Sequence, residues 1–599
     1  MDLITPMEWI IKAVQKFMRK HFNWFTNINF ILAILVITGS TLPTIMPDAD
    51  TDFFTATFTW TNIVFSVYNI LFSIYLYYHS RFWFIKISRV LFFMLAVFCL
   101  YLNIQIIIHG VGYHETLLAS MMLFLSFLVI SFQIASTGNT GIHPSLLFVF
   151  SFAALILFGS LLLILPEATT KPITFLQALF TSTSAVTVTG LAVLDTGKDF
   201  TYFGQIVILL LIQLGGIGIL TITNIFSLVF KASSSFRNRL MLGEMIKEMD
   251  DNKTFTTLFR IIAITLLVEA IGAVMIYFSI KDTPQVTNQP VFFAVFHAVS
   301  GFCNAGFSTL SSSLYDVSVK FNYFMQLVIC WLIITGGLGY TVMINHFRLL
   351  WQWIRKLLDL SIYRGDKAFA LIKNSVNSWI VFWMTLLLLV AGTGLFMAAE
   401  YDGVLREHSL FGKMVVSFFN ATTPRTAGFN NVDMGMLGIP SVMLIMALMW
   451  IGASPGSTGG GIKTTTFYLA IHNLYNQIMG KEQLVIKNKN IPQLAINQIN
   501  AVILLSIFAI SFGTFLLSFQ NPDKLFRDML FEAISAYSTV GLSLNLTPAL
   551  TEVSHSILIA LMFLGRVSFL TFLVGLFNQF LSQDDHGRPY YPNENVYVN

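Results

Sequence analysis

The chain has 599 residues and a formal net charge of +4 at pH 7, and 55% of its residues are hydrophobic while only 11% are charged. Soluble domains carry about 25% charged residues, so this composition excludes a soluble protein. The small positive charge indicates no nucleic-acid partner, and three cysteines in or beside apolar segments exclude a disulfide scaffold and a cysteine-ligated metal site.

Apolar segments dominate the chain, and about twelve of them approach the roughly 20 residues that span a bilayer. Four such segments come first, at residues 27–46, 56–78, 87–109 and 115–134. The other eight form four pairs, at residues 145–165 and 203–230, 256–280 and 323–350, 376–399 and 437–475, and 499–519 and 554–582. We therefore expect an all-α polytopic membrane protein with about four extra transmembrane helices at the N-terminus.

Lysine and arginine gather in the connections that one side of the membrane would share. They include Lys12, Lys16, Arg19, Lys20, Arg81, Lys86, Arg237, Lys247, Arg355, Lys356, Lys481 and Lys487. Positively charged loops face the cytoplasm. The chain is thus predicted to be a multi-pass protein of the cytoplasmic (inner) membrane, with both termini cytoplasmic.

Each of the four pairs encloses a loop with the same glycine-centred pattern. The glycines are Gly190, Gly306, Gly428 and Gly541. A phenylalanine stands ten residues before each glycine, and a hydroxyl residue stands six before it: Phe180, Phe296, Phe418 and Phe531, and Ser184, Ser300, Thr422 and Ser535. This shared register predicts four pseudo-repeats of helix, pore loop and helix around one central ion pore.

Each loop is too short to cross the bilayer, so it must enter and leave on one side and be buried in protein or face water. A short helix pointing inward turns the negative end of its dipole toward the membrane centre, which favours a cation. Glycine adopts positive φ without steric cost, so neighbouring carbonyls can face the axis and replace an ion's hydration shell. Packing of helix against helix by small residues explains any single glycine, but it does not explain four in one register.

The four loops resemble the selectivity-filter segments of the Trk/Ktr/HKT superfamily of potassium transporters, over roughly residues 145–582. The resemblance implies a TrkH/KtrB-like membrane subunit for potassium uptake, with potassium as substrate and no cofactor bound by this chain. It also implies that the filter backbone binds potassium through Val188, Thr189, Gly190, Asn304, Ala305, Gly306, Thr426, Ala427, Gly428, Thr539, Val540 and Gly541.

The resemblance divides the chain into five parts. They are residues 1–140 with the extra N-terminal segments, and pore repeats at 141–240, 241–360, 361–490 and 491–599, of which the last includes a short cytoplasmic tail. Four extra segments depart from the usual family pattern of none or two. The family also implies a homodimer, a cytosolic ring of nucleotide-binding regulatory subunits and surrounding membrane lipid.

A glycine-rich stretch interrupts the last segment of the third pair, and so much glycine with one proline cannot remain a stable helix. It resembles the family's intramembrane gating loop, with gating residues Gly456, Gly459, Gly460, Gly461 and Lys463. A phosphate-binding loop is rejected because Ile462 stands before the lysine and no strand precedes the glycines.

Arg566 lies within an apolar run, where a charge costs roughly 2.5–3.5 kcal/mol. The resemblance implies a place below the filter, where its charge raises the barrier to potassium. A structural pairing with Glu269 is the alternative. A column of glycines in the second helices, which includes Gly215, Gly336 and Gly565, is assigned to the same region.

Several other polar residues in and near the loops are expected to support the filter or its surroundings. Arg425 is expected to brace the filter from behind, with Glu532 as its partner, and His297 to be a packed, hydrogen-bonded residue. Asp195 and Asp199 either concentrate cations at the outer mouth or are solvated loop charges.

Two other functions compete with potassium uptake. Family members with serine at the first glycine tend to favour sodium, so Gly190 favours potassium over a sodium or mixed-cation transporter. A membrane-embedded enzyme would need clustered His, Asp or Glu inside the apolar segments, and the sequence contains no HExxH motif. The choice between a channel and a coupled symporter stays open.

Overall fold

A computed structural model describes residues 27–29, 31–37, 51–79, 83–109, 118–126, 129, 144–217, 254–281, 289–340, 342–343, 376–481 and 483–581. This part of the chain is helical, apart from a short antiparallel hairpin of β1 (Val485–Ile486) and β2 (Lys489–Asn490). The protein is therefore all-α, as the sequence predicts. Both termini and the basic N-terminal residues lie outside the described residues, and their predicted orientation stays a prediction.

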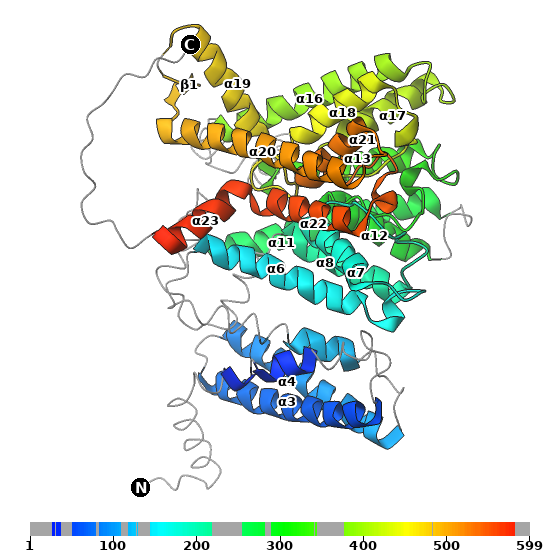
Figure 1. Ribbon diagram of the computed structural model, residues 1–599, viewed down its shortest axis with the longest axis vertical. Coiled ribbons are helices and arrows are strands. Elements are labelled where there is room, and N and C mark those ends of the chain that lie inside the picture. Colours follow the sequence, from blue (N-terminus) through cyan, green and yellow to red (C-terminus); the bar gives the residue numbers. More distant parts are fainter. Residues whose placement is uncertain are drawn as a thin grey trace, which may run out of the picture.

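The N-terminal helices α3 (Thr51–His79) and α4 (Trp83–His109) pack beside each other at one end of the long axis (Figure 1). With residues 31–37 and 118–126 and with Val129 they enclose a hydrophobic cluster of their own, which includes Phe65, Phe92 and Met122. This cluster shares no residue with the core around the glycine loops.

From residue 144 onward, four sets of helices each contain a long helix, a short helix and a third helix after the glycine loop. The sets are α6 (Pro144–Leu163), α7 (Phe175–Thr187) and α8 (Tyr202–Ile217); α11 (Thr254–Ile280), α12 (Pro290–Cys303) and α13 (Tyr323–Gly337); α16 (Val376–Glu400), α17 (Leu410–Thr422) and α18 (Ile439–Trp450); and α20 (Gln493–Gln520), α21 (Phe526–Tyr537) and α22 (Glu552–Val567). Among the described residues of this part, the other helices are α19 (Thr464–Ile478) and α23 (Phe569–Leu581). The short 3-10 turns there are η1 (Pro166–Ala168), η2 (Ser313–Tyr315), η3 (Met434–Met436) and η4 (Thr547–Ala549).

Three of the described helices are both long and apolar enough to cross a bilayer, at Arg260–Ile280, Val376–Glu400 and Gln493–Gln520. Several shorter apolar helices accompany them, among them Val149–Leu163, Tyr202–Ile217 and Tyr323–Gly337. The chain is thus a multi-pass membrane protein.

The last predicted segment, residues 554–582, is not one helix. It breaks at Ser568, which has a positive φ of 69° and separates α22 from α23. Serine rarely adopts such a conformation, and neither glycine nor proline stands at the break. The sequence therefore carries no signal for this turn.

The glycine column in the third helix of each set lets that helix approach the end of the short helix. A Cβ at Gly215, Gly336 or Gly565 would collide with a carbonyl oxygen of Val186, Phe302 or Tyr537, respectively. In each set this carbonyl belongs to the residue four positions before the loop glycine. The column therefore serves close packing behind the loops rather than forming a gate on its own.

Candidate functional site

Three of the four short helices end in the same hydrogen-bond pattern. In the first, the Val188 amide donates to Ala185 O at 3.2 Å and the Thr189 amide to Ser184 O at 2.8 Å. The second and fourth repeat these bonds, with 2.8 Å from Ala305 N to Ser300 O and 2.9 Å from Val540 N to Ser535 O. This is a Schellman end, which turns the chain sharply out of the helix.

The third loop departs from this pattern because Pro424 interrupts the end of α17, which stops at Thr422. The Ala427 amide donates to Thr423 O at 2.9 Å instead. Thr423 also donates its hydroxyl to Phe429 O at 2.6 Å, which is the role of Ser300 in the second loop. The predicted equivalents Phe418 and Thr422 are thus displaced by one position in this set.

Hydroxyl groups hold the loop backbone in the other sets as the register suggests. Ser184 Oγ accepts from the Gly190 amide at 3.0 Å, and Ser535 Oγ accepts from the Gly541 amide at 3.1 Å. Ser300 Oγ donates to Phe307 O at 2.8 Å. Each of these loops is therefore tied to the short helix that precedes it.

The backbone of every loop passes twice through positive φ. Two residues before the glycine, φ is 58° at Val188, 62° at Asn304, 70° at Thr426 and 50° at Thr539. At the glycines it is 95°, 69°, 77° and 92° in chain order. Positive φ is an outlier for β-branched residues, and such strain persists only where the surroundings impose it, commonly at functional sites.

The four loops meet in a closed ring. A Cβ on Gly190 would collide with Ala305 O, one on Gly541 would collide with Thr189 O, and one on Gly306 would lie 2.7 Å from Ala427 O. A Cβ on Gly428 would collide with Val540 O and would also lie 3.2 Å from Thr189 O of the set across the ring. The carbonyl before each glycine therefore lies against the glycine of a neighbouring loop, and a side chain would fill the narrow centre.

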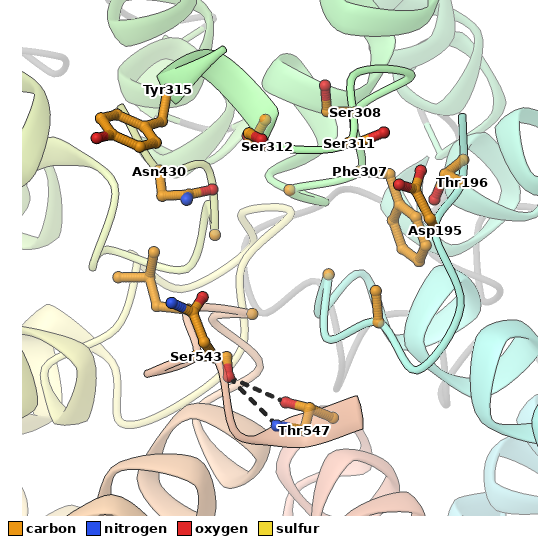
Figure 2. A pocket seen from close by; sticks show the side chains of 18 of the residues that line it. Asp195, Thr196, Phe307, Ser308, Ser311, Ser312, Tyr315, Asn430, Ser543 and Thr547 are labelled. Atoms are coloured by element: carbon orange, nitrogen blue, oxygen red, sulfur yellow. Dashed lines mark hydrogen bonds between the residues drawn. The ribbon is translucent and has the colours of Figure 1, made fainter. Parts of the chain in front are cut away.

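A cavity of about 410 Å³ lies on one side of this ring (Figure 2). All four loop glycines line it, together with residues that follow them in each loop. Figure 2 shows Asp195, Ser308, Asn430 and Ser543 reaching it from the first, second, third and fourth sets.

Acidic side chains in and beside the cavity accept hydrogen bonds from the loops around it. Asp195 Oδ1 accepts from the Gly197 amide at 2.8 Å, and Asp199 Oδ2 accepts from the Asp195 amide at 2.7 Å. Asp433, which the sequence reasoning missed, accepts from the Asn545 side-chain amide at 3.1 Å. Asp195 and Asp433 line the cavity while Asp199 does not.

The glycine-rich loop lies against the other side of the ring. The Gly452 amide donates to Ile462 O at 2.8 Å, which closes the loop between α18 and α19. A Cβ on Gly459 would collide with the Thr426 hydroxyl, and one on Gly460 with the Thr539 hydroxyl. Bare glycine backbone thus packs directly under two of the strained residues.

Side chains pin this loop in place. Lys463 Nζ donates to Gly459 O at 2.6 Å and to Gly460 O at 3.3 Å. Thr458 Oγ1 donates to Phe302 O at 3.3 Å. Gly456 has a positive φ of 70°, and a Cβ at this residue would meet no atom within 4 Å, so Gly456 faces open space.

Arg566 links the glycine-rich loop to the first set. Its Nη1 donates to Thr458 O and its Nη2 donates to Gly215 O at 2.6 Å. The alternative pairing with Glu269 is wrong, because Glu269 accepts hydrogen bonds from Gln213 and Cys303 instead. Carbonyl oxygens carry no sequence signal, so these partners were not predictable.

The predicted pairing of Arg425 with Glu532 is also wrong. Arg425 Nη2 donates to Thr385 Oγ1 at 3.2 Å, whereas Glu532 accepts from Ser543 and, at 2.9 Å, from Thr547 Oγ1. His297 is packed and hydrogen-bonded as predicted, with ring nitrogens 2.9 Å from Phe293 O and from Ser308 Oγ.

An ion pair links two of the connections between helices. Lys320 Nζ lies 2.5 Å from Glu407 Oε2, and this hydrogen bond, followed by the attraction of the two charges, lowers the pKa of Glu407. The neighbouring His408 Nδ1 lies 3.0 Å from the Tyr323 hydroxyl. These contacts join the connection after the second glycine loop to the start of α17.

Comparisons with known proteins agree with this architecture. Residues 143–585 match the family model TrkH, described as a cation transport protein. The Ktr system potassium uptake protein B of Bacillus subtilis is 35% identical over 433 residues, which cover 72% of this chain and 92% of that protein. The potassium/sodium uptake protein NtpJ of Enterococcus hirae is 32% identical over 442 residues, which cover 73% of this chain and 93% of that protein.

A solved structure shares the fold. The crystal structure of the potassium transporter TrkH from Vibrio parahaemolyticus aligns with a TM-score of 0.57 at 16% sequence identity. The alignment covers 87% of this chain and 99% of that chain.

Proposed function

Because the chain belongs to the TrkH family of cation transport proteins, we propose that it takes up potassium across the cytoplasmic membrane through the ring of glycine loops. The family consists of transporters rather than enzymes. The single observation that carries the proposal is the closure of the ring, in which the carbonyl before each glycine lies against the neighbouring loop. Converging carbonyls replace the hydration shell of a monovalent cation.

The ion is held by backbone oxygens of the four filter strands. Each strand contains one of the loop glycines, Gly190, Gly306, Gly428 or Gly541. Strained positive φ at Val188, Thr426 and Thr539 supports this role, because such strain concentrates at ligand sites. The cavity beyond the ring is the outer mouth, where Asp195 and Asp433 attract cations. Potassium is the substrate and needs no cofactor.

Conduction is controlled from the other side of the ring by residues 456–463 and Arg566. The contacts of Gly459 and Gly460 with filter threonines support a loop that obstructs the path directly below the filter. Arg566 holds that loop through Thr458 O, and its charge opposes a cation below the filter.

The arrangement of the repeats and the partners of this chain are also proposed from its membership of the family. Four pseudo-repeats at residues 141–240, 241–360, 361–490 and 491–599 surround one pore, and residues 1–140 form the additional bundle. The protein acts as a homodimer among membrane lipids, with a cytosolic nucleotide-binding regulatory subunit, which the name "Ktr system" of a relative supports. Both termini face the cytoplasm.

The second candidate is a sodium or mixed-cation transporter, because NtpJ is described as a potassium/sodium uptake protein. Uptake of radioactive rubidium and sodium into liposomes that contain the purified protein separates the two. Potassium uptake predicts rubidium accumulation that excess potassium suppresses and excess sodium does not. Equal suppression by both ions favours the mixed-cation function, and no uptake of either ion rejects transport by this chain.

A further inference from the structure

Glu269 is a buried carboxylate in the middle of the membrane helix α11, and its side chain is only 5% exposed. None of the ion pairs within the described ranges involves it. A charged side chain inside a bilayer is costly and commonly marks a transport pathway. The filter and its gate, as described above, do not use Glu269.

The carboxylate joins three helices. Gln213 of α8 donates its side-chain amide to Oε2 at 3.2 Å, and the Cys303 thiol of α12 donates to Oε1 at 3.7 Å. Both partners are donors, and each donates to a different oxygen of the Glu269 carboxyl group. The three residues therefore form a hydrogen-bonded cluster in which one carboxyl group accepts from two donors.

Cys303 is the last residue of α12 and directly precedes the filter strand of the second set. Its other side is bounded by Gly216, where a Cβ would lie 2.8 Å from the Cys303 Cβ. The thiol is thus held between Gly216 and Glu269. Any shift of Cys303 moves Asn304, which has a positive φ of 62°, and Ala305, whose carbonyl lies against Gly190.

The charged and titratable groups near this cluster come from two other elements. Arg566 of α22 and Tyr340, which follows α13, both interact electrostatically with Cys303, and Tyr340 also interacts with Glu269. The Arg566 guanidinium donates its hydrogen bonds to Thr458 O and Gly215 O.

We infer that Glu269 is a positioning residue for the second filter strand. Its carboxylate holds the Cys303 thiol, and through it the backbone oxygens of Asn304 and Ala305 at the ring. The inference rests on the proposed function, because it concerns the affinity of the filter for potassium.

The test replaces Glu269 by glutamine and measures rubidium uptake by proteoliposomes as a function of rubidium concentration. The amide group at position 269 would face a donor, so one buried donor loses its partner. We expect Glu269→Gln to raise KM by about tenfold, with a much smaller change in the maximal rate. A merely structural role would lower the amount of folded protein and leave KM unchanged.

Two further variants separate positioning from general damage. The swap Glu269→Gln with Gln213→Glu keeps one carboxylate and one amide, so Cys303 again donates to an oxygen, and KM is expected to return toward the wild-type value. Cys303→Ser keeps a donor and should retain KM, whereas Cys303→Ala should raise it. If Glu269→Gln does not fold, the two cysteine variants decide the question.

Glu400→Gln is a matched control. Glu400 is also buried, at 4% exposure, but its carboxylate accepts from Ser441 Oγ at 2.6 Å and from the Gly438 amide at 2.9 Å. We expect lower thermal stability and an unchanged KM. An unchanged KM in Glu269→Gln, or a raised KM in both cysteine variants alike, overturns the inference. Absence of rubidium uptake by the wild type rejects the proposed function instead.

Discussion

Replacing Arg566 by alanine is expected to raise the rate of potassium flux into proteoliposomes by about tenfold, since a hydrogen bond to a charged group contributes about 1.5–3 kcal/mol. The guanidinium joins Thr458 O of the glycine-rich loop to Gly215 O of α8. Without it the loop loses its tie to the first set, and the positive charge below the filter disappears. Both changes lower the barrier to a cation.

The flux assay with saturating potassium measures this effect, and Arg527→Ala is the control. Arg527 belongs to α21, and its Nε donates to the neighbouring Asp528 at 2.8 Å rather than to the glycine-rich loop. Its removal should leave the flux unchanged. An Arg566→Ala protein that folds normally and conducts at the wild-type rate would contradict a gating role.

Replacing Gly190 by serine is expected to lower the preference for potassium over sodium by about tenfold, because a distorted ring of carbonyls no longer fits one ion better than the other. The φ of 95° at Gly190 strains any L side chain. A Cβ there would collide with Ala305 O and lie 3.1 Å from the Gly306 Cα. The ring must therefore deform at its first and second strands.

Growth of a potassium-uptake-deficient bacterium at low potassium, with and without added sodium, gives the first readout for Gly190→Ser. Rubidium and sodium fluxes in liposomes give the ratio itself. Gly394→Ser is the control, because Gly394 lies within the helix α16 and a Cβ there meets no atom within 4 Å. A wild-type flux ratio in Gly190→Ser would show that this strand does not select the ion.

Repetition within the sequence predicted the elements that build the site. The apolar segments predicted α6, α11, α16 and α20 closely, and the glycine register located the four loops. Local glycine and proline content also predicted the break between α18 and α19. These signals succeed because backbone conformation and membrane burial constrain residue type at each position separately.

Other features of the site depend on contacts between segments that are distant in the chain, and the amino-acid sequence indicates these contacts less clearly. Pro424 moves the supporting phenylalanine and hydroxyl of the third set to Phe419, which is fully buried, and Thr423. A register counted from the glycine alone cannot detect that shift. Arg425 and Arg566 both bind neutral oxygens, so searching for acidic partners by charge led to the wrong pairs.

The most direct test of the whole account locates the ion. Crystals of the protein grown with thallium, which substitutes for potassium and scatters anomalously, should show a peak at the centre of the ring. The peak should lie among the carbonyl oxygens of Thr189, Ala305, Ala427 and Val540. A ring without anomalous density, with thallium found only in the outer cavity or away from the four loops, would contradict the account.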